Sequence, residues 1–323
     1  MGRILFLNSL RTIGSVNAPF CPDTPIKTEG CIIFTAENNS NEPKNEKRRF
    51  QIKSKNIIAI ASGKGGVGKS TFAMNFALAL KVIGLKVGIL DADIYGPSLP
   101  LTMGIQANPE VDEDQKIIPL EKHNLKLMSF GFISGNQAPV VWRGPLVAKM
   151  TEQFFRDVKW GDLDYLILDL PPGTGDVQLT LSQKIPLDGA IIVTTPNDIA
   201  LTDVRKGADM FKKVETELLG VVENMSYMEI SGAVPGSKNA DIVINGEKVT
   251  TNENGKFNLK FDLFKRGGGK TESTRLDIPL LAEVPYSHEL MESIDSGEPI
   301  VFYDKESPVS KIFLKLAQQI AAI

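Results

Sequence analysis

A run of glycines and lysines between residues 62 and 71 has the residue types that bind phosphate. It reads Ser62-Gly-Lys-Gly-Gly-Val-Gly-Lys-Ser-Thr71 and satisfies the pattern GxxxxGK[ST]. Glycines in such a loop let successive backbone N–H groups point inward at an anion, and a following helix adds the positive end of its dipole. The residues expected to bind nucleotide phosphates are Gly63, Lys64, Gly65, Gly66, Val67, Gly68, Lys69, Ser70 and Thr71.

Two side chains of this loop carry the most specific expectations. Lys69 is expected to hold the β- and γ-phosphates of ATP, and the Ser70 hydroxyl is expected to ligate Mg²⁺. The alternative is a glycine-rich turn without function. A β-branched run precedes the loop and a helical pattern follows it, and this context favours the phosphate site.

Three aspartates follow apolar runs that are typical of buried strands. Asp91 and Asp93 come directly after residues 87–90, and Asp169 ends the run Tyr165-Leu-Ile-Leu-Asp. Asp169 is expected to hold Mg²⁺ through water, Asp91 to support the metal shell, and Asp93 to orient or deprotonate the attacking water. Each aspartate taken singly is equally well explained as a helix cap. Their position at strand ends, where open α/β sheets bind ligands, favours the functional interpretation.

The elements that position these residues follow from a change in hydrophobic period along the chain. From Asn56 onward, short β-branched runs alternate with longer helical patterns, which predicts βαβ units, a mainly parallel sheet and an α/β fold. The runs are continuously apolar, as in strands covered on both faces, so we expect a P-loop NTPase three-layer sandwich. The expected strands are Ile57–Ala61, Val87–Leu90, Leu125–Phe130, Tyr165–Asp169, Ala190–Thr194, Leu219–Glu223 and Leu280–Val284.

Two segments depart from this alternation. Residues 241–263 alternate polar and apolar side chains around Asn245-Gly246 and Asn254-Gly255, which predicts an inserted β-hairpin at about residues 235–263. Residues 35–49 are polar, charged and rich in asparagine, which indicates a flexible linker. We therefore divide the chain into an N-terminal arm and linker over 1–55 and an ATPase domain over 56–323.

Composition excludes several classes of protein. The 323 residues are 42% hydrophobic with a net charge of -3, so no broad basic surface is available for DNA. No apolar run reaches the ~20 residues that a membrane span needs. Cys21 and Cys31 are the only cysteines, which indicates a reducing compartment, and we expect the cytoplasm. The alternative is import into an organelle through an N-terminal transit peptide, because no acidic residue precedes Asp23.

Lys64 connects the loop to a known class of ATPase. An ordinary P-loop needs no lysine directly after its first glycine, and the pattern Gly-Lys-Gly-Gly-Val-Gly-Lys-Ser resembles that of the deviant Walker A ATPases. In that class the extra lysine reaches across a dimer interface to phosphates held by the partner, as an arginine finger does. The resemblance implies a homodimer in which Lys64 is catalytic together with Lys69 and Asp93. The alternative is a solvated surface charge.

The chain from about Asn56 onward resembles one branch of that class, the Mrp-type iron–sulfur cluster carrier ATPases. The matching segments beyond the P-loop are Asp91–Ser98, Trp142–Pro145, Asp169–Asp176, Thr194–Pro196 and Glu223–Ser226. The resemblance implies ATP and Mg²⁺ as cofactors and a role in cluster assembly or transfer to iron–sulfur apoproteins. It further implies that Asn224 approaches the adenine, and it places Arg143 in a family hallmark.

One family feature is missing. Members carry a Cys-x-x-Cys pair shortly after Glu-Asn-Met-Ser, so that two subunits supply four thiolates to a [4Fe-4S] cluster. The corresponding stretch here, Tyr227–Ala233, has no cysteine. A cluster at the usual place is therefore not expected, and the spacing of Cys21 and Cys31 is weak for a metal site.

Other members of the class supply the remaining alternatives. Nitrogenase-type reductases are excluded by the missing cysteines, and partitioning ATPases are disfavoured by the charge. Division-site ATPases bind membranes through a C-terminal amphipathic helix, but residues 309–323 have only Lys311 and Lys315 opposite their apolar face. We expect this helix to pack on the domain instead. A nucleotide-switched adaptor without its own cluster stays open as the second function.

Overall fold

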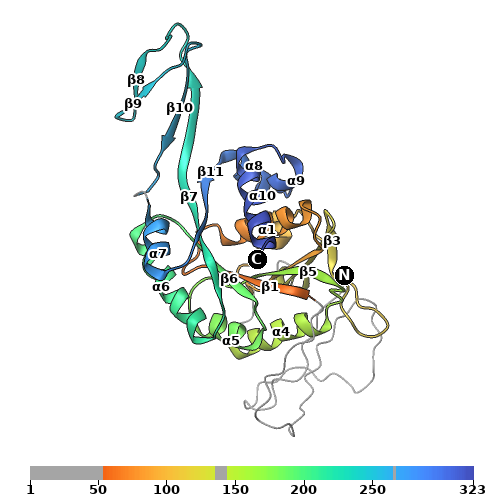
Figure 1. Ribbon diagram of the computed structural model, residues 1–323. Coiled ribbons are helices and arrows are strands. Elements are labelled where there is room, and N and C mark those ends of the chain that lie inside the picture. The colour runs from red at the N-terminus through yellow and green to blue at the C-terminus, as the bar shows by residue number, and fades with distance from the viewer. Residues whose placement is uncertain (1–53, 135–143, 265–266) are drawn as a thin grey trace, which may run out of the picture.

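A nine-stranded sheet runs through the computed structural model, which describes residues 54–134, 144–264 and 267–323 (Figure 1). The strand order is β10-β7-β6-β1-β5-β2-β4-β3, and β11 also pairs with β7. The central pairs are parallel, whereas β3 and β10 pair antiparallel at the two ends. The strands are β1 (Ser54–Ala61), β2 (Val87–Asp91), β3 (Leu120–Lys122), β4 (Leu125–Ser129), β5 (Leu163–Asp169), β6 (Gly189–Thr194), β7 (Leu218–Ala233), β8 (Asp241–Ile244), β9 (Glu247–Thr250), β10 (Lys256–Phe261) and β11 (Leu280–Tyr286).

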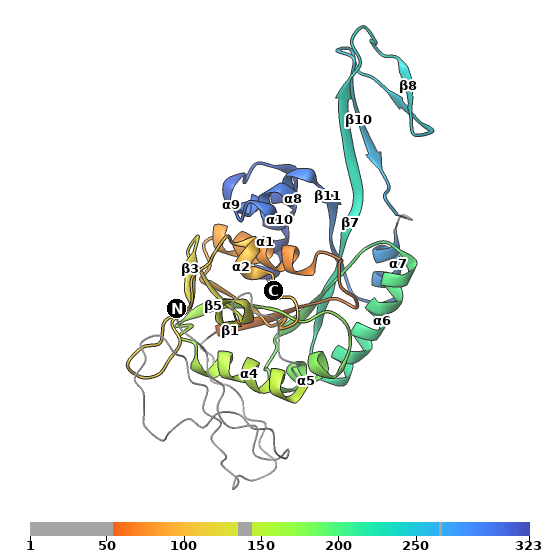
Figure 2. The ribbon, with the colours of Figure 1, turned by 180° about the vertical axis from the view of Figure 1, so that it is seen from behind.

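Helices cover both faces of this sheet. On one face α1, α8, α9 and α10 pack over alternate strand residues such as Ile60 and Ile167, and on the other α4, α5 and α6 pack over Ala59 and Leu168 (Figures 1 and 2). The helices are α1 (Lys69–Val82), α2 (Leu99–Thr102), α3 (Phe130–Ser134), α4 (Gly144–Asp157), α5 (Asp176–Lys184), α6 (Asp198–Lys213), α7 (Gly268–Leu276), α8 (His288–Asp295), α9 (Ile300–Tyr303) and α10 (Pro308–Ala321). The expected three-layer α/β sandwich is confirmed.

The C-terminal helix α10 belongs to the core. Its residues Phe313, Leu316 and Ile320 are buried, and the Phe313 ring lies 5.6 Å from the ring of Phe72 in α1. The apolar face that a membrane-binding helix would need is therefore covered by the domain, as expected. Within the described residues, no helix is long and apolar enough to cross a bilayer.

A long arm projects from the body (Figures 1 and 2). Its stem is the outer part of β7 paired antiparallel with β10, from Met228↔Phe261 to Ala233↔Lys256. Its tip is the hairpin of β8 and β9, which closes around Asn245-Gly246 with Asn245 at φ 51° and Gly246 at φ 87°. The expected hairpin is thus present at the first Asn-Gly pair.

The arm also corrects two details of the sequence interpretation. Strand β7 does not end at Glu223 but continues to Ala233, because β10 supplies a partner for the additional residues. The second pair, Asn254-Gly255, does not connect two paired strands, since β9 pairs with β8 and β10 pairs with β7. Period-2 alternation located the strands but did not specify which of them pair.

Candidate nucleotide-binding site

The P-loop lies between β1 and α1, as the motif requires. Gly68 is the N-cap of α1 at φ 80°, a left-handed conformation that favours glycine, and no acidic residue occupies the first helical turn. The first N–H groups of a helix have no partner within it, and the dipole adds positive potential there. The loop and helix start therefore form a site for an anion.

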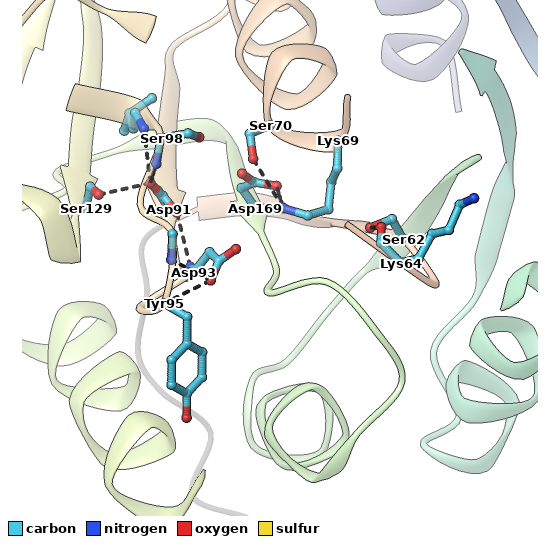
Figure 3. Close-up of polar contacts among 12 residues, drawn as sticks. Ser62, Lys64, Lys69, Ser70, Asp91, Asp93, Tyr95, Ser98, Ser129 and Asp169 are labelled. Atoms are coloured by element: carbon cyan, nitrogen blue, oxygen red, sulfur yellow. Dashed lines mark hydrogen bonds and ion pairs between the residues drawn. The ribbon is translucent and has the colours of Figure 1, made fainter. Parts of the chain in front are cut away.

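Lys69 links this loop to the end of β5. Its Nζ lies 2.5 Å from Asp169 Oδ1 and 3.3 Å from Ser70 Oγ (Figure 3). Both members of the ion pair are buried, at 6% and 2% exposed. A buried charge requires such a partner, and removing one member of a buried pair typically costs ~3–5 kcal/mol.

A backbone hydrogen bond also joins the loop after β5 to the P-loop. The N–H of Gly173, which has φ 99°, donates to the Ser62 carbonyl at 2.9 Å. Ser62 Oγ in turn donates to the Lys64 carbonyl at 2.9 Å. The P-loop is therefore joined directly to the segment that follows Asp169.

Asp91 organises the loop after β2. Its Oδ2 accepts hydrogen bonds from the N–H groups of Ser98 and Leu99 and from Ser129 Oγ, and its Oδ1 accepts from the N–H of Asp93 (Figure 3). Burial, with added repulsion from Asp169, raises the pKa of Asp91 to about 7, although these hydrogen bonds and Lys69 oppose the shift. The carboxylate thus caps α2 and fixes the residue 91–99 loop.

Asp93 is the more accessible of the two aspartates. Its Oδ1 accepts from the N–H groups of Tyr95 and Gly96 at 3.2 and 3.3 Å. Partial burial raises its pKa, whereas Lys69 lowers it. Asp93 lines a pocket of about 670 Å³ between the loop after β2 and the start of α5. Of the three aspartates, only Asp93 lines this pocket.

Asn224 and Lys64 make contacts outside the ion pair of Lys69 and Asp169. Asn224 Nδ2 donates to the Val67 carbonyl at 2.8 Å and is buried, so the side chain braces the P-loop. A Cβ on Gly68 would lie 2.3 Å from the same nitrogen. Lys64 extends away from Lys69 and Asp169, and its Nζ donates to Asn197 Oδ1 at 3.3 Å (Figure 3).

The structure thus brings most of the expected site residues to one edge of the sheet. Strand pairing places Asp91 beside Asp169, and the P-loop carries Lys69 and Ser70 to them. One hydroxyl and carboxylates at strand ends suit Mg²⁺, which keeps several waters and takes few protein ligands. Arg143, Cys21 and Cys31 lie outside the described residues, in which no group of three or more His, Cys, Asp or Glu side chains is arranged to hold a metal.

Sequence reasoning missed three polar residues near this edge. Ser129 lies at the end of β4 beside Asp91. Its position at a strand end is the same signal that selected the aspartates. Asn197, the partner of Lys64, comes directly after the segment Thr194–Pro196. Gln178 lines the pocket from α5 and gave no motif signal.

Comparisons with known proteins find similar chains and a similar fold. The ParA-type family model described as NUBPL iron-transfer P-loop NTPase matches residues 53–238 and 233–321. An iron–sulfur cluster carrier protein of Pseudomonas fragi is 44% identical over 265 residues, which cover 81% of this chain and 84% of that protein. The iron–sulfur cluster transfer protein NUBPL of Mus musculus is 42% identical over 266 residues, covering 82% and 76%. A solved structure of a nucleotide-binding protein from Archaeoglobus fulgidus in complex with ADP is 33% identical, with a TM-score of 0.61 and coverage of 80% and 91%.

Proposed function

The chain belongs to the family of NUBPL iron-transfer P-loop NTPases, and we propose that it binds ATP with Mg²⁺ and hydrolyses the β–γ phosphoanhydride as a homodimer. The observation that carries this proposal is the buried contact between Lys69 and Asp169 at the open start of α1. In this proposal, Lys69 supplies the cation for the phosphates and Asp169 supplies the carboxylate for the metal.

The roles of the residues follow from their positions. The backbone of residues 63–71 cradles the phosphates, and Lys69 moves from Asp169 to the β- and γ-phosphates. The Ser70 hydroxyl and Asp169, the latter through water, would hold Mg²⁺, which would supply positive charge to neutralise the phosphates. Asp91 fixes the loop behind them, and Asp93 orients or deprotonates the attacking water.

Lys64 serves the partner subunit in this proposal. Its side chain extends away from its own Lys69 and Asp169 (Figure 3), so it is not needed to bind the phosphates of its own site. Its contact with Asn197 is a single hydrogen bond of 3.3 Å, which dimerisation can replace. A homodimer then places each Lys64 at the phosphates of the other subunit.

The proposed biological role is delivery of iron–sulfur clusters to apoproteins. The relatives are named as cluster carrier or transfer proteins, and this chain is 44% and 42% identical to two of them. The cluster is the cargo of this process. A [4Fe-4S] cluster bound by thiolates has only Cys21 and Cys31 available in each subunit, so holding one requires both subunits to contribute the pair.

A nucleotide-switched adaptor is the second candidate, favoured by the projecting arm. The arm begins at Met228, two residues after the end of Glu-Asn-Met-Ser, where the family resemblance predicts the cysteine pair. ATP would then control dimerisation and docking of assembly factors, and hydrolysis would reset the state.

Iron and acid-labile sulfide, measured after anaerobic reconstitution, separate the two candidates. The matched variant is Cys21→Ala/Cys31→Ala. About four irons per dimer in the wild type, lost in the variant, support a carrier that uses the N-terminal pair. No stable iron in either protein rejects the carrier and leaves the adaptor.

We propose the cytoplasm as the compartment, because two cysteines fit a reducing environment. Import into an organelle is the alternative suggested by the basic N-terminal residues. Imaging of the full chain with a C-terminal fluorescent fusion tests this, since a mitochondrial signal contradicts the cytoplasmic assignment.

A further inference from the structure

Gln178 is a buried polar residue whose amide oxygen has no hydrogen-bond partner in the protein. It lies in the first turn of α5 and is 2% exposed, and its Oε1 accepts no hydrogen bond. Leaving a buried acceptor unpaired costs about 1–3 kcal/mol. A residue that carries such a cost indicates a bound group that supplies the missing donor.

The location of Gln178 indicates what that group is. The residue lines the 670 Å³ pocket, which is also lined by the loop that carries Asp93. The pocket opens beyond the ends of β2 and β5, which are adjacent parallel strands, and this is where open α/β sheets bind ligands. Pro171 and Pro172, which closely follow Asp169 in the chain, also line the pocket, so the pocket adjoins the phosphate site.

A water molecule matches the two walls of the pocket. The side chains of Asp93 and Gln178 each carry an acceptor oxygen, and a water has two O–H donors. A water that donates to both keeps its lone pairs directed away from them. Such an arrangement orients a nucleophile, because a lone pair of the oxygen must point at phosphorus for attack.

We propose that Gln178 is a positioning residue that, together with Asp93, holds the water that attacks the γ-phosphate. The inference rests on the proposed ATP hydrolysis and adds a residue to it. In the reaction the water oxygen forms a bond to the γ-phosphorus, and the bond from phosphorus to the bridging oxygen breaks. The electron pair of the broken bond stays on ADP. Asp93 takes the proton of the water and passes it to the released phosphate.

A second buried hydroxyl offers a competing explanation. Ser182 lies one turn further along α5, and its Oγ is also buried without a partner. A structural water shared by Gln178 and Ser182 would satisfy both side chains without any part in catalysis. Ser182 does not line the pocket, so the two explanations differ in the effect of removing its hydroxyl.

The test compares four variants of the full chain. Gln178→Met removes the acceptor with little change in shape, and Gln178→Glu keeps an acceptor oxygen. Gln183→Met is the matched control, because Gln183 is exposed on the same helix. Ser182→Ala tests the structural water. The measurements are kcat and KM for Mg²⁺-ATP, the affinity for ADP and the thermal unfolding midpoint.

The positioning role predicts that Gln178→Met lowers kcat by about tenfold or more, as loss of one oriented hydrogen bond does. KM and the ADP affinity stay within about twofold, and the unfolding midpoint stays equal or rises because an unpaired acceptor has been removed. Gln178→Glu recovers much of kcat, and the Gln183→Met and Ser182→Ala proteins hydrolyse ATP like the wild type.

Several results would overturn the inference. These are an unchanged kcat in Gln178→Met, a fall in its unfolding midpoint that parallels the loss of kcat, or an equal loss in Ser182→Ala. A wild type that does not hydrolyse ATP refutes the proposed function, and the positioning role with it. An active wild type with an equally active Gln178→Met refutes the positioning role alone.

Discussion

Replacing Asn224 by alanine separates a brace on the P-loop from a contact to the adenine. Asn224 Nδ2 donates to the Val67 carbonyl at 2.8 Å, and the side chain is only 6% exposed. The substitution leaves that carbonyl without its donor, which costs about 1–3 kcal/mol of folding stability. Because the freed carbonyl belongs to the phosphate-binding loop, we expect phosphate binding to weaken as well, by up to about tenfold for each 1.4 kcal/mol.

The assay compares nucleotides that share phosphates but differ in the base. Urea unfolding gives the stability change, and calorimetric titration gives the affinities for ATP and GTP. A brace predicts that both affinities fall by the same factor while stability falls. Asn258→Ala, an exposed asparagine on the arm, is the control and should change neither. A large loss for ATP alone, with unchanged stability, would refute the brace and support the adenine contact.

Three further predictions follow from the same structure. Lys64→Ala should retain ATP binding but lose most turnover, since Lys64 faces away from its own phosphate site; undiminished phosphate release would reject the dimer mechanism. Burial raises the pKa of Glu223 above 4.5, so the folded protein binds a proton at this carboxyl more strongly than the unfolded chain does. The free energy of unfolding therefore falls as the pH rises from 4.5 through the folded-state pKa, by at most about 1.4 kcal/mol per pH unit. Glu223→Gln should remove this contribution from the pH dependence of urea unfolding above pH 4.5, and an unchanged slope would contradict the assignment. Phe313→Ala should destabilise the domain by about 3–5 kcal/mol because Phe313 packs on Phe72; an effect no larger than that of exposed Lys315→Ala would show that α10 does not belong to the core.

Local patterns in the sequence predicted most of the sheet. Continuous apolar runs identified the central strands, and the helical pattern that follows the P-loop identified α1. These signals work because burial on both faces and helical periodicity act on neighbouring residues. The pairing of β10 with the outer part of β7 was not predictable in this way, because it joins segments separated by the β8–β9 hairpin.

Two local patterns made part of the candidate site predictable. The P-loop motif and the strand-end rule found Lys69, Asp169, Asp91 and Asp93, since parallel strands end at one edge of the sheet. Gln178 was not predictable, because its unpaired amide is a property of packing and leaves no spacing pattern in the chain. The bracing contact of Asn224 likewise depends on where β7 passes the loop.

The proposed ATPase activity is best tested by measuring phosphate release from ATP by the wild-type protein. It is measured with Mg²⁺ and with chelator over a range of protein concentrations, with Lys69→Ala as the inactive control. We predict Mg²⁺-dependent phosphate release whose rate per subunit rises with protein concentration, because two subunits complete each site. Lys69→Ala should release no phosphate. Absence of Mg²⁺-dependent release by the wild type at every concentration, despite tight ATP binding, would contradict it.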